Sequence, residues 1–163
     1  MNRMAVVIVV VTGCGLISCC SVCKAIDIVA TGAWSPAIGA ADLQGGAGTD
    51  LEPAYESNAD QVTITISNTT GIGDNWRVDV KRTDSNWHGD YILSVKRTGA
   101  GAGGGSIAGG TDYQEVTTNY AALYSGTGDR NDIPIQFKLA GVSIRIPPDT
   151  YSTTITYTVV DTL

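Results

Sequence analysis

From residue 26 onward, apolar and polar residues alternate with a period of two, which is the spacing of a β-strand with one buried face. The segments that show this pattern are 26–34, 62–67, 76–81, 91–96, 133–146 and 151–159. No stretch repeats apolar residues at every third and fourth position over the length that a stable helix needs, although 113–124 is ambiguous. The pattern therefore predicts an all-β protein.

The first 25 residues have a different character and match a secretory signal peptide. Arg3 supplies a short positive region, residues 5–18 form an apolar run, and small residues lead to Ala25. The run is too short to span a bilayer comfortably, so the mature chain is expected to have no transmembrane span. We predict three parts: a signal peptide at 1–25, a first strand with a glycine- and alanine-rich tether at 26–50, and a β-sandwich at 51–163.

Two other fates of this leader stay open. Residues 11–14 and 16–19 both resemble the lipobox of bacterial lipoproteins, which would leave a lipid-modified Cys14 or Cys19 at the new N-terminus. The leader could also remain as an uncleaved anchor. The cysteines of the chain are all in the leader, at Cys14, Cys19, Cys20 and Cys23. A chain cut after Ala25 therefore has no disulfide framework.

The part after the leader is about the size of one sandwich domain. Seven or eight short strands, joined by loops rich in Gly, Asn, Asp and Pro, are typical of an immunoglobulin-like antiparallel β-sandwich. A closed barrel of the same strands is the alternative.

The chain has 10 basic and 16 acidic residues. Without Arg3 and Lys24, 8 basic and 16 acidic residues remain, which gives a net charge of -8. This balance argues against nucleic-acid binding, which needs Lys and Arg arrayed on one face.

The first strand suggests how the protein associates. One face of 26–34 carries Ile26, Ile28, Ala30, Gly32 and Trp34. Residues 35–50 are rich in glycine and alanine, and such a tether would let the strand leave its domain. An apolar strand added to the sheet edge of a neighbour gives β-augmentation, so we predict a homopolymer formed by strand exchange. The alternative is that 26–34 folds back into its own domain, which produces the same alternation.

A resemblance supports export and assembly. The turn at 146–151, with Pro147, Pro148 and Asp149, runs into alternating Thr and aliphatic residues at 152–159. This segment resembles the closing strand of secreted pilin-like sandwich subunits, including the spore coat U type. That resemblance implies a secreted subunit that polymerises on the cell surface. The same segment is also similar to cell-wall-binding domains of the WxL type, which would imply a peripheral wall binder. The chain departs from the pilin pattern at Asp149, where glycine is usual, and lacks a disulfide in the mature part.

The residues that could carry chemistry are few. His88 lies close in sequence to Asp84 and Ser85, but no nucleophile elbow accompanies them, so we predict no enzyme activity and no cofactor. Two groups of oxygen-bearing residues are weak metal candidates, each better explained as turn formers: Asp84, Asn86 and Asp90, and Asp129 and Asp132.

Residues 83–90 are predicted to form a hairpin loop between two strands. Trp87 lies beside His88 in this loop and is a candidate ligand contact, because an exposed indole can stack on a sugar ring. Packing over the end of the sandwich is the alternative for this side chain. The second functional hypothesis is therefore a surface module that binds host or wall carbohydrate, with or without a lipid anchor. The glycine-rich segment at 98–111 lacks the context of a phosphate-binding loop and is predicted to be a mobile surface connection or a tip loop.

Overall fold

The computed structural model describes residues 4–14 and 25–162. Arg3, Cys19, Cys20 and Cys23 of the predicted leader lie outside these ranges. Within them the chain forms strands and one short 3₁₀ helix, and the elements are, in order, β1 (Met4–Cys14), β2 (Asp27–Trp34), β3 (Ala37–Ile38), η1 (Ala40–Asp42), β4 (Ala54–Glu56), β5 (Val62–Ser67), β6 (Asn75–Asn86), β7 (Ile92–Arg97), β8 (Ile107–Gly109), β9 (Gln114–Glu115), β10 (Ala121–Thr127), β11 (Arg130–Ala140) and β12 (Thr150–Asp161).

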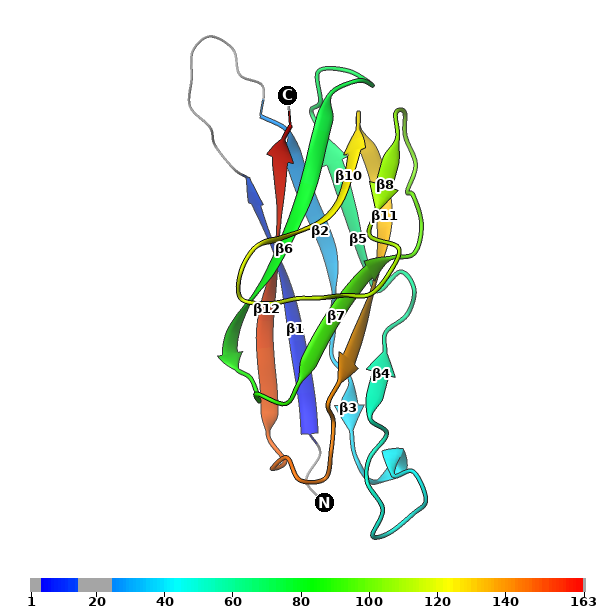
Figure 1. The fold of residues 1–163 in the computed structure, drawn as a ribbon, viewed down its shortest axis with the longest axis vertical. Coiled ribbons are helices and arrows are strands. Elements are labelled where there is room, and N and C mark those ends of the chain that lie inside the picture. The colour runs from blue at the N-terminus through cyan, green and yellow to red at the C-terminus, as the bar shows by residue number, and fades with distance from the viewer. Residues whose placement is uncertain (1–3, 15–24, 163) are drawn as a thin grey trace.

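These strands form two sheets that pack face to face, so the all-β sandwich prediction is confirmed (Figure 1). One sheet has the order β8-β10-β6-β12-β1, and the other has β2-β5-β11-β7-β9 with β4 on β11. All pairs are antiparallel except β1 and β12, which run parallel. After the leader, the strands of six residues or more within the described ranges are β2, β5, β6, β7, β10, β11 and β12. The sequence predicts seven or eight strands, and the shorter β3, β4, β8 and β9 come in addition to these seven.

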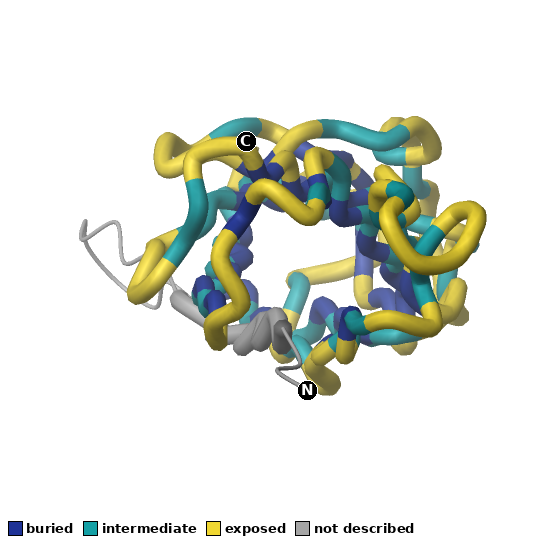
Figure 2. Tube along the Cα trace, turned by 90° about the horizontal axis from the view of Figure 1, so that it is seen from below, coloured by how far each residue is buried: buried dark blue, intermediate teal, exposed yellow. Residues whose placement is uncertain are grey.

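The core lies between the sheets and is built from alternate strand positions. Val62, Ile64 and Ile66 of β5 are fully buried, while the threonines between them are half-buried. On β6, Trp76, Val78 and Val80 are likewise buried, and the residues between them are half-buried. Viewed along the long axis, buried positions follow the strands and the exposed positions gather in the connections (Figure 2). The period-two pattern thus places the core faces correctly.

One predicted strand is shorter than expected. The alternation was expected to continue through Val142, Ile144 and Ile146, but β11 ends at Ala140 and a turn follows. Gly141 has φ +80°, and an added Cβ would lie 1.9 Å from the carbonyl oxygen of Asp90. Val142 and Ile146 still point into the core, whereas Ile144 is exposed.

Two connections also differ from expectation. Residues 83–90 were predicted to form a hairpin loop, but β6 pairs with β10 and β12 while β7 pairs with β9 and β11. The connection therefore crosses from one sheet to the other. The 35–50 segment, predicted to be a tether, contains β3 and η1, a bridge between Leu43 and Leu51, and the buried side chain of Ile38.

The glycine-rich segment 98–111 packs against the β10–β11 hairpin instead of extending from the surface as a free loop. Ala102 forms a bridge with Asn131, and the Arg130 guanidinium donates a 2.8 Å hydrogen bond to the carbonyl oxygen of Gly105. An added Cβ at Gly105, where φ is +78°, would lie 2.1 Å from the carbonyl oxygen of Thr127. Here glycine permits close approach of two backbones.

This packing gives a stability prediction. Replacing Gly105 with alanine should destabilise the fold by about 1–3 kcal/mol, because the new methyl group overlaps the backbone at a positive φ. Gly73→Ala is the matched control, since nothing lies within 4 Å of its Cβ position. Urea unfolding of both variants measures the difference. An equal, small effect of the two substitutions would mean that 98–111 does not pack on the hairpin in solution.

Among the described residues the helical structure is the three-residue η1, so no helix there has the length and apolar character of a membrane span.

Candidate self-association edge

The most distinctive feature of the sandwich is the way that β12 is covered on both sides. One edge of β12 pairs with β6, from Ser152 opposite Asn86 to Asp161 opposite Trp76. The other edge pairs with β1 in parallel, from Ala5 opposite Thr150 to Cys14 opposite Val159. The strand that completes this sheet is therefore the apolar run of the predicted leader.

Every predicted cleavage of the leader removes that strand. A cut after Ala25 removes residues 1–25, and lipoprotein processing at Cys19 or Cys14 removes everything before that cysteine. In each case residues 4–13 are lost, and β12 becomes the edge of its sheet. A strand edge exposes a row of backbone N–H and C=O groups that accept another strand readily.

The residues of β12 offer little protection against such pairing. Its inward positions are buried with β1 in place: Tyr151, Thr153, Ile155, Tyr157 and Val159. Its outward positions are half-buried and uncharged: Ser152, Thr154, Thr156, Thr158 and Val160. Natural sheet edges are usually blocked by Lys, Pro or very short strands. Neither a charged residue nor a proline occurs between 150 and 160.

Two of the other outer strands are very short. The opposite edge of the same sheet is β8, with three residues, and the far edge of the second sheet is β9, with two. Against these, β12 has twelve residues. The near edge of the second sheet is β2, with eight residues that include Asp27. The longest edge segment without a charged residue is therefore residues 150–160 of β12, along which β1 pairs.

The buried hydroxyl of Thr153 has a local explanation. Its Oγ1 lies 3.1 Å from the carbonyl oxygen of Thr83, to which it donates, and 2.9 Å from Oδ1 of Asp84. Asp84 also accepts a hydrogen bond from the Arg82 guanidinium. The register between β6 and β12 shifts next to Thr153. These side-chain hydrogen bonds therefore lie at the irregularity in the pairing of the two strands.

On its other side β1 touches the second sheet. Ile8 is opposite Trp34 and Val9 is opposite Ala33 on β2, while Met4 is opposite Ile38 on β3. Trp34 is buried and stacks on Phe137 with ring centroids 6.2 Å apart. The place of β1 therefore lies between β12 and β2.

The predicted donor residues lie in their own domain. β2 pairs with β5, from Asp27 opposite Ser67 to Gly32 opposite Val62, which is the folded-back arrangement. Ile26, Ile28 and Trp34 are buried, Ala30 is half-buried and Gly32 is exposed. Gly32 has φ +122°, and an added Cβ would lie 2.5 Å from the carbonyl oxygen of Gln61. Ile26, Ile28 and Trp34 therefore face inward as expected, Gly32 does not, and the partner of the strand in this structure is β5.

Trp87 packs at the end of the sandwich. Its ring contacts Tyr91 edge to face at 5.5 Å, and its Nε1 donates a 3.3 Å hydrogen bond to the Tyr91 carbonyl oxygen. The Arg82 guanidinium lies over the indole at 5.3 Å. The indole is partly buried against the core.

The oxygen-bearing candidates make hydrogen bonds that shape turns and strand ends. Asp129 accepts from the backbone N–H and the hydroxyl of Thr69, and Asn86 donates to Asp149 and to the carbonyl oxygen of Thr150. Asp90 lies 3.8 Å from Nδ1 of His88, and the backbone N–H of Asp132 donates to Thr65. Within 4–14 and 25–162, no three His, Cys, Asp or Glu side chains are grouped to hold a metal ion.

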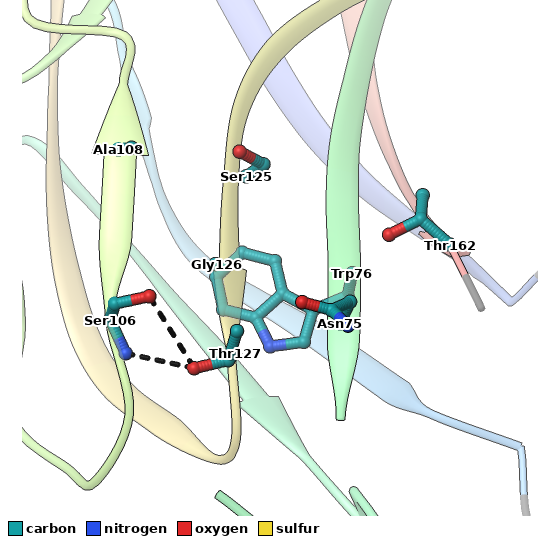
Figure 3. A pocket seen from close by; sticks show the side chains of 8 residues that line it. All are labelled: Asn75, Trp76, Ser106, Ala108, Ser125, Gly126, Thr127 and Thr162. Atoms are coloured by element: carbon teal, nitrogen blue, oxygen red, sulfur yellow. Dashed lines mark hydrogen bonds between the residues drawn. The ribbon is translucent and has the colours of Figure 1, made fainter. Parts of the chain in front are cut away.

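A surface depression of about 430 Å³ lies beside β6, β8 and β10 (Figure 3). It is lined by uncharged residues: Asn75, Trp76, Ser106, Ala108, Ser125, Gly126, Thr127 and Thr162. The Trp76 side chain is fully buried, and its Nε1 donates a 2.8 Å hydrogen bond to the carbonyl oxygen of Gly128. Its indole therefore offers no open face for stacking on a ligand.

Comparison of the chain with protein-family models and with curated proteins found no match.

Proposed function

We propose that the processed chain is a secreted structural subunit of a cell-surface filament, which associates with further copies of itself by β-strand pairing. The observation that carries this proposal is the pairing of the leader strand β1 along β12. A protein that loses β1 on export has a long, uncharged sheet edge, and main-chain hydrogen bonds from another strand would satisfy it.

The segment 26–34 is the proposed donor strand. Its new N-terminal end is created by the same cleavage that removes β1, so the segment can be withdrawn from one domain and inserted into another without threading a loop. Its anchors are Ile26, Ile28 and Trp34, which already fill a sheet-to-sheet core in this structure. The alternating spacing would set the register in a neighbour.

A disulfide staple tests this exchange. Val29 and Thr65 lie directly opposite each other on β2 and β5, and neither is fully buried. Opposite positions in an antiparallel ladder have Cα atoms about 4.5–5.5 Å apart, within the range that a disulfide bridges. In the Val29→Cys/Thr65→Cys variant, oxidation should lock 26–34 in its own domain. We expect electron microscopy to show no filaments from the oxidised variant and filaments after a reducing agent is added.

The single variant Val29→Cys is the matched control, because it cannot form the staple and should assemble in both conditions. Filaments of normal number and length from the fully oxidised double variant would show that 26–34 does not move between copies. Dispersed particles from the unmodified secreted protein would contradict the filament itself.

A further inference from the structure

The place that β1 leaves cannot be filled by exchange of 26–34 alone. A copy that receives this strand from one neighbour has given its own strand to another, so the number of strands in each sandwich is unchanged. If the received strand lies on β12, the edge of β5 is left open; if it lies on β5, the edge of β12 is left open. One strand position per copy stays empty in either case.

We propose that β12 pairs with β12 of a second copy, antiparallel and about a two-fold axis, once the leader strand is gone. This inference rests on the proposed function, because it requires leader removal and self-association. It does not require 26–34 to leave its own domain. Two copies then share their open edges, and one continuous sheet forms with the order β6-β12 followed by the partner's β12-β6.

The residues of β12 suit pairing with themselves. In an antiparallel pair the outward positions face outward positions of the other copy, and here these are Ser, Thr and Val. Like charges directly opposite each other would destabilise the pair, and none occurs between 150 and 160. The inward positions bring Tyr and β-branched residues together, which is a favourable cross-strand combination.

Length also selects β12. With β1 removed it offers backbone groups over most of its twelve residues, whereas β8 and β9 have three and two, and β2 has eight that include the charged Asp27. A strand pair of two or three residues contributes too few hydrogen bonds to hold two copies together. A two-fold interface uses the same surface on both copies and closes on itself. Together with exchange of 26–34 it would make a filament of dimers.

Cysteine cross-linking gives a direct test. Cleavage after Ala25 leaves no natural cysteine, so single cysteines at Ser152, Thr154, Thr156 and Thr158 report on this edge alone. The secreted, processed protein is used, with its N-terminus determined by mass spectrometry and the unsubstituted protein as background. Each variant is oxidised by itself and in mixed pairs. We expect disulfide dimers only for pairs whose residue numbers add up to one constant value, as an antiparallel two-fold pair requires.

Two further arms separate the outcomes. The oxidised Val29→Cys/Thr65→Cys staple should leave the association of β12 unchanged, so loss of filaments with retained dimers supports both proposals separately. A disulfide between Thr31→Cys and Thr156→Cys would instead place 26–34 on β12 and overturn the β12 pair. Equal cross-linking at all four positions, or none, would also overturn it. The uncleaved chain, in which β1 covers β12, should give no dimer through Ser152, Thr154, Thr156 or Thr158 once its four natural cysteines are replaced by serine.

A charge variant tests the same edge without cysteines. Thr154→Lys/Thr156→Lys places like charges near the centre of the paired strands and should weaken the dimer at least tenfold, as measured by analytical ultracentrifugation. Thr63→Lys on β5, an outward threonine of the second sheet, is the control and should leave dimerisation unchanged. Thermal unfolding checks that both variants fold. An unchanged dimer in the folded double variant would overturn the proposal.

Discussion

Replacing Trp76 with alanine is expected to destabilise the sandwich by about 3–5 kcal/mol, the range found for large aromatic residues removed from a core. Its side chain is fully buried, donates a hydrogen bond to Gly128 and meets Tyr124 edge to face at 6.2 Å. An added Cβ at Gly126 would lie 2.6 Å from two atoms of the indole, so the backbone of β10 is fitted closely to the ring. Such a loss is a large fraction of the stability of a typical domain, which is about 5–15 kcal/mol.

Trp87→Ala is the matched control, because the same side chain is removed from a partly buried position. We expect a smaller loss of about 1–2 kcal/mol, in proportion to the smaller apolar area that leaves contact with the protein. Urea unfolding, followed by circular dichroism, measures both variants. Equal losses from the two substitutions would contradict the position of Trp76 at the centre of the core.

Alkaline pH is expected to unfold the protein through its buried tyrosines. Burial raises the pKa of Tyr55 and of Tyr113 to about 12. Burial also raises the pKa of Tyr91, Tyr124 and Tyr157 above the ordinary value. In the unfolded chain a tyrosine loses its proton near about pH 10. Above that pH the unfolded state binds fewer protons than the folded state, so the free energy of unfolding falls as pH rises.

The stability that these tyrosines contribute is therefore fully present below about pH 10 and is lost as pH rises toward and beyond about 12. Urea unfolding at several pH values measures the fall, and ultraviolet absorption of tyrosinate shows when the groups ionise. The control is Tyr124→Phe/Tyr157→Phe, which should show a flatter dependence on pH. Within the described residues the hydroxyls of both tyrosines lack a hydrogen-bond partner, so their loss should be neutral or stabilising near neutral pH. An unchanged slope would show that these two side chains do not remain protonated in the fold.

The strands were predictable because a strand with one buried face has an apolar residue at every second position. Val62, Ile64 and Ile66 illustrate this: their spacing alone places them on a strand and in the core. The end of β11 was not predictable in the same way. The backbone N–H of Ile144 donates a 2.8 Å hydrogen bond to Asp50, which is 94 residues away in the chain. Contacts over such a distance leave no periodic signal in the local sequence.

The candidate site was predictable in part. The inward face of 26–34 follows from its alternation, but the same alternation fits a strand that is exchanged and one that folds back. The run at 5–11 is apolar at every position, so it carries no sign of which face is buried or of its pairing with β12. The packing of the glycine-rich segment 98–111 on the β10–β11 hairpin was not predictable, because glycine serves both flexible loops and close backbone contacts. The two roles of glycine can be told apart only from the surface that the segment contacts, which includes Thr127.

The brevity of β8 and β9 sets a limit on growth. In a pair of molecules joined through β12, the outermost strands of the shared sheet are the two β8 strands, each three residues long. The second sheet of each molecule ends on one side in β9, two residues that include Glu115, and on the other side in β2. An arriving third molecule would find too few main-chain groups on β8 and β9 to seed a cross-β stack. Growth into amyloid-like ribbons through β8 or β9 is thus discouraged by the architecture.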